Sequence, residues 1–117
     1  MRQLGYTWYA TEPKNQEWMW DGVAWEQSGG WVLNQPLVLE SQWDDKEDVE
    51  DDFQRLMVAR ADHRVLVFEA YTQDDADIIV KECIHAVGAY RGTAAGDRYL
   101  FACWLADNRF YFRLHVV

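Results

Sequence analysis

The sequence predicts an α+β fold that combines a mixed, mainly antiparallel sheet with two helices. Three observations predict it: apolar segments of strand length, two stretches with apolar residues at helical spacing, and ample material for a core. Of the 117 residues, 50% are hydrophobic and 15% are aromatic. A chain of this length can bury roughly 65% of its unfolded surface in one core, so residues 1–117 are expected to form a single domain.

Three strands are expected in the N-terminal part of the chain. The second is rich in aromatic residues, residues 27–30 turn the chain, and the third returns antiparallel with its best part after Pro36. Period-two geometry along that third strand places Val38, Glu40 and Gln42 on one face. The expected strands are residues 5–10, 17–25 and 31–43.

The remaining chain is expected to alternate helices and strands, giving the order β-β-β-α-β-α-β-β. A compact apolar strand lies between the two helices, and a hairpin around Asp107 and Asn108 ends the fold. In its last strand, four apolar side chains share one face: Phe110, Phe112, Leu114 and Val116. The expected elements are helices 46–61 and 74–90 and strands 64–70, 98–105 and 110–117.

The first helix is acidic and amphipathic. Val49, Phe53, Leu56 and Met57 recur at helical spacing, and Asp44 or Asp45 is expected to cap the N-terminus. The acidic first turns favour the positive end of the helix dipole. Much of the acidic block therefore has a local structural explanation.

The net charge of −9 disfavours avid, sequence-independent nucleic-acid binding by an isolated monomer, because the surface field repels phosphates. The charge is uneven, since residues 44–52 hold seven acidic side chains. Beyond residue 90 the balance is locally basic, with four arginines against two aspartates: Arg91, Arg98, Arg109 and Arg113 against Asp97 and Asp107.

No apolar run approaches the ~20 residues that cross a bilayer, and the N-terminal segment lacks the features of a secretory signal. We therefore expect a cytoplasmic protein with no membrane partner. Cys83 and Cys103 have apolar neighbours and no C-x-x-C companion, so buried thiols are expected. The histidines His63, His85 and His115 show no metal-ligand spacing.

Asp21 on one expected strand is followed by Glu40, Ser41 and Gln42 on its partner, then by an amphipathic helix and an apolar strand. Over residues 18–70 this arrangement resembles the PD-(D/E)xK nuclease superfamily. There, an acidic residue at the end of one strand and a (D/E)-x-K triplet on the next converge at the edge of the sheet. The resemblance implies a restriction-endonuclease-like core.

The resemblance also implies a divalent-cation site. Asp21 and Glu40 would hold Mg²⁺ or Mn²⁺, because hard oxygen ligands from adjacent strands suit such cations. Gln42 stands where the family has lysine and would position water, and Arg55 on the following helix would contact phosphate. Trp20 stands where the motif has proline, and no helix is expected before the first strand.

Structural interpretations of the same residues stay open. Asp21 and Gly22 would also suit a turn, and Glu40 would also suit an ion pair with Arg55 or Arg64. The tryptophans before residue 44 fit core packing or a homodimer interface, or else a stacking platform for bases or sugars. These tryptophans are Trp8, Trp18, Trp20, Trp25, Trp31 and Trp43.

Two functions follow from the sequence. The first is a small metal-dependent nuclease-like protein, or an inactive derivative of one, that reaches nucleic acid as a dimer or with a partner. The second is a non-enzymatic acidic module of antitoxin, immunity or nucleic-acid-mimic type, which binds a protein through the acidic helix and the tryptophan-rich strands.

Overall fold

The computed structural model describes residues 6–10, 22–29, 31–43 and 46–117. It confirms the expected order β-β-β-α-β-α-β-β. The elements are β1 (Tyr6–Ala10), β2 (Gly22–Ser28), β3 (Trp31–Gln42), α1 (Lys46–Met57), β4 (His63–Ala70), α2 (Gln73–Ala89), β5 (Arg98–Leu105) and β6 (Phe110–Val116). The expected caps Asp44 and Asp45 lie outside the described residues.

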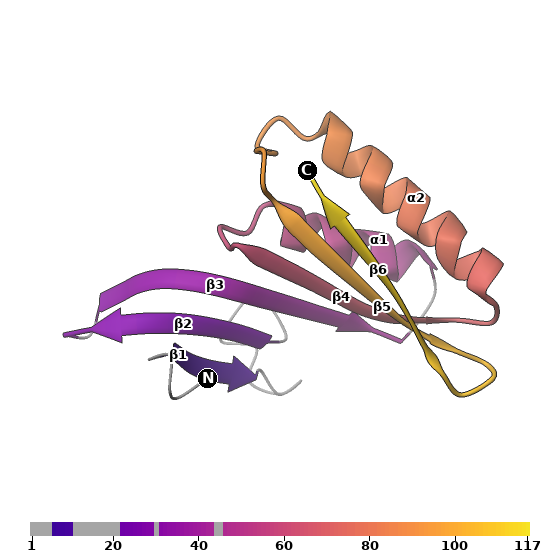
Figure 1. Ribbon diagram of the computed structural model, residues 1–117, viewed down its shortest axis with the longest axis horizontal. Coiled ribbons are helices and arrows are strands. Elements are labelled where there is room, and N and C mark those ends of the chain that lie inside the picture. The colour runs from indigo at the N-terminus through magenta and orange to yellow at the C-terminus, as the bar shows by residue number, and fades with distance from the viewer. Residues whose placement is uncertain (1–5, 11–21, 30, 44–45) are drawn as a thin grey trace.

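The strands form one mixed sheet whose spatial order, β1-β2-β3-β4-β5-β6, is also their order in the sequence (Figure 1). Neighbouring strands are antiparallel at β1–β2, β2–β3 and β5–β6, and parallel at β3–β4 and β4–β5. The expected mixed, mainly antiparallel sheet is confirmed. Each parallel pair is joined through a helix, as a parallel connection requires.

Two boundaries differ from the sequence prediction. Strand β2 continues to Ser28, through residues expected to turn, because the turn is made at Gly29 with a φ of 57°, a value that glycine adopts without strain. Helix α1 ends at Met57, earlier than residue 61. The Arg64 guanidinium donates a 2.7 Å hydrogen bond to the Ala59 carbonyl, which fixes the chain in a turn there.

Both helices pack on the same face of the sheet (Figure 1). Helix α1 contacts β3 and β4, helix α2 contacts β4, β5 and β6, and the helices contact each other. Strand β4 lies between β3 and β5, so the two crossovers advance in one direction across the sheet. Crossovers of the same hand that advance in one direction place their helices on one side.

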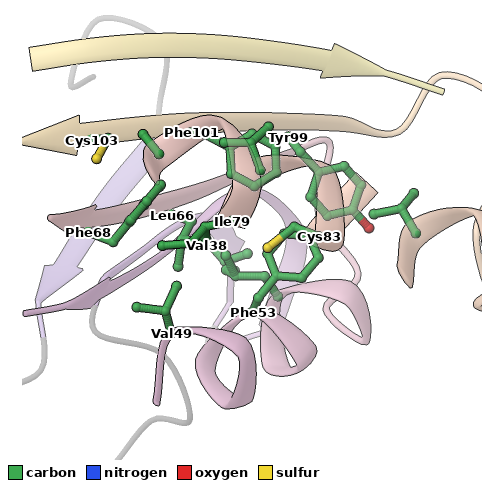
Figure 2. Packing of buried hydrophobic residues seen from close by; sticks show 14 of the residues in the cluster. Val38, Val49, Phe53, Leu66, Phe68, Ile79, Cys83, Tyr99, Phe101 and Cys103 are labelled. Atoms are coloured by element: carbon green, nitrogen blue, oxygen red, sulfur yellow. The ribbon is translucent and has the colours of Figure 1, made fainter. Parts of the chain in front are cut away.

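The core fills the space between this helix layer and the sheet (Figure 2). Phe53 of α1 lies at its centre, with its ring centroid 5.4 Å from that of Tyr99 and 5.6 Å from that of Phe101. Leu66 and Phe68 of β4 are fully buried beside these rings. The burial pattern of β4 alternates, so one face of this central strand supplies most of its core contacts.

The last strand is tied to the helix layer by a polar contact. The Asp77 carboxylate of α2 accepts hydrogen bonds from the Tyr111 hydroxyl at 2.6 Å and from the Arg113 guanidinium at 2.9 Å. The β5–β6 hairpin turns at Asn108, whose φ is 63°, as the sequence predicts for this region. These contacts fix the orientation of β6 at the edge of the sheet.

Both cysteines are free and buried, as expected. Burial, reinforced by the nearby charges of Glu50 and Glu82, raises the pKa of the Cys83 thiol to about 12. Burial likewise raises the pKa of Cys103 to about 11. Among the described residues, no helix is long and apolar enough to cross a membrane.

Replacing Phe53 with alanine should lower the free energy of unfolding by about 3–5 kcal/mol, because it empties the space against two aromatic rings of the sheet. Denaturant unfolding followed by circular dichroism measures the change. Tyr71→Ala, at a strongly exposed position, is the control and should change stability by less than about 0.5 kcal/mol. Equal effects for both variants would contradict the packing described.

The Cys83 thiol should make stability fall as pH rises above 9. Its ordinary pKa is 9.0 and its folded pKa is about 12, so the unfolded chain releases this proton first and unfolding becomes more favourable. In Cys83→Ala, the decline of unfolding free energy between pH 9 and 10.5 should be shallower by up to about 1.4 kcal/mol per pH unit. Identical slopes would be inconsistent with a protonated buried thiol.

Candidate functional site

The candidate site begins with a carboxylate in the buried row of β3. Val38 and Glu40 face the helix layer, and Glu40 is only 1% exposed. Gln42, two residues further on, bonds to α1, so the three side chains share the face that the alternation predicts. A buried strand row that begins apolar thus becomes polar toward the carboxyl end of β3.

Helix α1 supplies two charged side chains to this row. Asp52 and Arg55 are three residues apart, a spacing that puts them on the same side of a helix, and their side chains form an ion pair at 3.0 Å. Asp52 is 6% exposed and lies in the stripe formed by the buried Val49, Phe53 and Leu56. Because that stripe packs on the sheet, Asp52 is held against β3.

Four side chains therefore converge, and we call them the β3–α1 cluster: Glu40, Gln42, Asp52 and Arg55. Arg55 Nη1 lies 3.7 Å from Glu40 Oε2, and Arg55 Nη2 lies 3.0 Å from Asp52 Oδ1. Gln42 Nε2 donates to the second oxygen of Asp52, Oδ2, at 3.0 Å. Two carboxylates from different elements thus share one guanidinium.

The electrostatics of the cluster follow from its burial. An isolated carboxylate in a protein interior costs several kcal/mol, so Glu40 and Asp52 require cationic or hydrogen-bonding partners. The planar guanidinium of Arg55 presents several donors and can address both acids at once. The Arg55 side chain is 47% exposed, so its guanidinium contacts the buried carboxylates of Glu40 and Asp52 from the solvent side.

Glu40 and Asp52 offer oxygen donors of the kind that Mg²⁺ and Mn²⁺ prefer, and they already surround a cationic group. Within the described part of the chain, no group of three or more His, Cys, Asp or Glu side chains lies together as a ready metal site. The described residues offer two carboxylates as candidate oxygen ligands, Glu40 and Asp52, and Gln42 holds the second of them.

Three of the four site residues that the sequence predicts are brought together: Glu40, Gln42 and Arg55. The fourth, Asp21, lies outside the described residues. Of the two arginines considered as partners of Glu40, Arg55 makes the pair. Arg64 is engaged elsewhere, with Nη1 3.4 Å from the Asp97 carboxylate and its guanidinium carbon 5.1 Å from the centroid of the Tyr99 ring.

Asp52 is the member that sequence reasoning missed. Its acidic neighbours suggest a solvated first half of the helix, and the helix dipole explains them. The missed signal is its position, three residues after Val49 and four before Leu56, which places it within the apolar stripe. An acid at a core-facing position is informative because burial of its charge requires a partner.

The tryptophan-rich region is described only in part. Trp43, directly after β3, has an exposed side chain. The side chains of the other five early tryptophans lie outside the described part of the chain, so an aromatic platform there remains an expectation.

Comparison of the chain with protein-family models, with curated proteins and with solved structures finds no match.

The pair formed by Glu40 and Arg55 should show measurable coupling. In a double-mutant cycle, Glu40→Gln and Arg55→Met should couple by about 1 kcal/mol, because each change removes one side of a partly buried ion pair. Equilibrium unfolding of the four proteins measures this energy. The matched cycle of Arg55→Met with Asp74→Asn, an exposed acid on α2, should couple by less than about 0.3 kcal/mol, and equal coupling in both cycles would refute the contact.

Proposed function

We propose that the protein is nuclease-like and hydrolyses phosphodiester bonds with a divalent cation at the β3–α1 cluster. The observation that carries the proposal is the convergence of Glu40 and Asp52, from a strand and a helix, on one cationic group. Both carboxylates contact the same guanidinium, and carboxylate oxygens are the ligands that Mg²⁺ or Mn²⁺ would take. The resemblance to the PD-(D/E)xK superfamily, which rests on Asp21, Glu40 and Gln42, points to the same chemistry.

Glu40 and Asp52 would hold the cation, with Asp21 as the further ligand that the resemblance implies. Bound there, Mg²⁺ or Mn²⁺ would supply charge stabilisation and a water of lowered pKa. The donor set fits, since it consists of hard carboxylate oxygens. Gln42 contributes by holding Asp52 Oδ2 with its amide nitrogen, which fixes the direction of the other carboxylate oxygen.

Arg55 is the residue that we assign to the phosphate. Its guanidinium is half exposed, and its geometry matches two oxygens of a phosphodiester at once. Glu40 and Asp52 would no longer need Arg55 for neutralisation if they held a cation, and the half-exposed guanidinium would then be available to substrate. The proposal thus gives Arg55 two alternative partners: the two acids without metal, and the phosphate with it.

The proposal includes a second subunit or a partner protein for nucleic-acid affinity, because a chain of net charge −9 repels phosphates at long range. The arginines beyond residue 90 are the cations available for this purpose, and Arg109 and Arg113 are both partly exposed. A cytoplasmic location remains part of the same proposal.

A non-enzymatic interaction module is the second candidate function. It is favoured by the ion pairs of Arg55, whose guanidinium already neutralises Glu40 and Asp52. These pairs give the cluster a structural role, because they join α1 to β3. In this alternative the acidic helix layer is the binding surface for a protein, and the nuclease-like arrangement serves only as a scaffold.

Calorimetric titration with Mn²⁺ separates the two functions. We expect about one Mn²⁺ per chain, bound at least ~10-fold more weakly by Glu40→Gln, by Asp52→Asn and by Asp21→Asn, because each removes a charged ligand. Asp51→Asn is the matched control: it removes the adjacent, exposed acid of the same helix and should bind as the wild type does. Circular dichroism verifies that each variant is folded.

Cleavage of single-stranded and double-stranded DNA and RNA with 5 mM Mn²⁺ is measured on the same proteins. Turnover by the wild type and the Asp51 variant, and its loss in the Glu40 and Asp52 variants, would support the nuclease. Identical calorimetric traces for the wild type and the Asp52 variant would rule out a metal site here. Mn²⁺ binding without any cleavage would leave the module as the better account.

A further inference from the structure

The face of the sheet opposite the helices is mainly apolar across four strands. Register places Leu39, Val65, Leu100 and Leu114 in one row, and the next row contains Ser41, Val67, Ala102 and Phe112. Trp104 and Phe110 pair beside them. We call this surface the open face and define it by the residues Leu39, Val65, Val67, Leu100, Ala102, Trp104, Phe110, Phe112, Leu114 and Val116.

The open face is most exposed along β6. Phe112 is 59% exposed and Leu114 is 65% exposed, and Phe110 and Val116 are also exposed. The aromatic rings are ordered along the strand, with Phe110 in edge contact with Trp104 at 4.9 Å and stacked on Phe112 at 5.7 Å. Both described helices lie on the other side of the sheet, so neither covers these side chains (Figure 1).

We propose that a second copy of this chain covers the open face, giving a two-fold homodimer in which two sheets pack face to face. A two-fold interface uses the same patch on both partners, and an apolar sheet face is self-complementary in this sense. The proposal does not depend on the nuclease-like function.

The exposed apolar area along β6 supplies about half of what each partner of a stable dimer buries. The four apolar side chains of β6 expose on the order of 400 Å², since an aromatic or large aliphatic side chain presents about 150–250 Å² in full. Val65, Val67, Leu100 and Trp104, which are partly exposed, extend the patch over β4 and β5. A standard interface buries about 800 Å² per partner, so one strand provides roughly half of it.

The charge distribution allows two copies to meet at this face. Among the described residues of β3–β6, the titratable side chains on this side of the sheet lie at its margins: Glu69 at one end, and His63 and Arg98 at the other. Nine of the twenty acidic residues lie on α1 and α2, on the opposite side of the sheet. In the dimer these helix layers lie outermost and about 30 Å apart, because each packed layer adds roughly 10 Å, and the Debye length at physiological salt is about 8 Å.

The open face is also presented rigidly. Asp77 holds Tyr111 and Arg113 on the helix side of β6, so Phe112 and Leu114, which alternate with them, are fixed toward the open side. Side chains that are ordered before association lose less conformational entropy when they bind, which favours affinity.

Sedimentation equilibrium from 1 to 100 μM tests the proposal. The wild type should have twice the chain mass of 13.8 kDa. The variant Phe112→Asp/Leu114→Asp should be monomeric over this range, with a dissociation constant raised at least 100-fold, because dimerisation would bury four carboxylates. Single Leu114→Ser, a milder change, should weaken the dimer about 10-fold and serves if the double variant does not fold.

Val58→Asp/Ile78→Asp is the matched control. It introduces the same two charges at two exposed apolar positions, next to α1 and on α2, and should remain dimeric. Thermal melts verify that the variants are folded. A wild type that stays monomeric at 100 μM, a dimer that survives in folded Phe112→Asp/Leu114→Asp, or a dimer lost equally in the control would each overturn the proposal.

Discussion

The packing of both helices on one face of the sheet is the constraint from which the other features follow. It arises because β3, β4 and β5 are consecutive neighbours, so that both crossovers advance in the same direction. Each side chain of these strands therefore lies on one of two different faces of the sheet. Side chains on the helix side enter the core or the β3–α1 cluster, and their alternate neighbours stand on the open face.

This constraint explains why a strand with a single acid in an apolar run can be stable. Glu40 lies on the helix side, where α1 delivers a guanidinium to it. The same acid at position 39 or 41 would lie on the open face, beside Val65 or Val67 of β4. The alternation of the strand thus decides whether the carboxylate meets the Arg55 guanidinium or only apolar side chains.

Much of the fold was predictable because its elements have clear periods. The helix-side row of β3, the stripe of α1 through Val49, Phe53 and Leu56, and the hairpin at Asn108 follow from spacing alone. The end of α1 was not predictable, because it depends on a hydrogen bond from Arg64 of β4, a residue beyond the helix. Local sequence does not encode such tertiary contacts.

The candidate site was predictable to a similar extent. Glu40 and Gln42 stand out because polar residues interrupt an apolar strand, and Arg55 because it is basic in an acidic helix. Asp52 does not stand out in the sequence, because it lies among other acids and the helix dipole explains the acidic block as a whole. Which face of the sheet stays uncovered also depends on the order of strands in space, and periodicity does not specify that order.

Charge is buried more deeply at α1 than at α2, and this difference has a consequence for where the molecule opens first. Detaching α1 returns Glu40, Asp52 and Arg55 to water and recovers hydration that their burial had cost. The fully buried residues of α2 are all apolar, and its ion-paired Asp77 keeps part of its hydration in the folded chain, so detachment of α2 recovers less. Local opening should therefore cost less free energy at α1 than at α2. The helix that borders the candidate site is then the one that moves more readily, on the millisecond scale at which proteins admit ions and substrates.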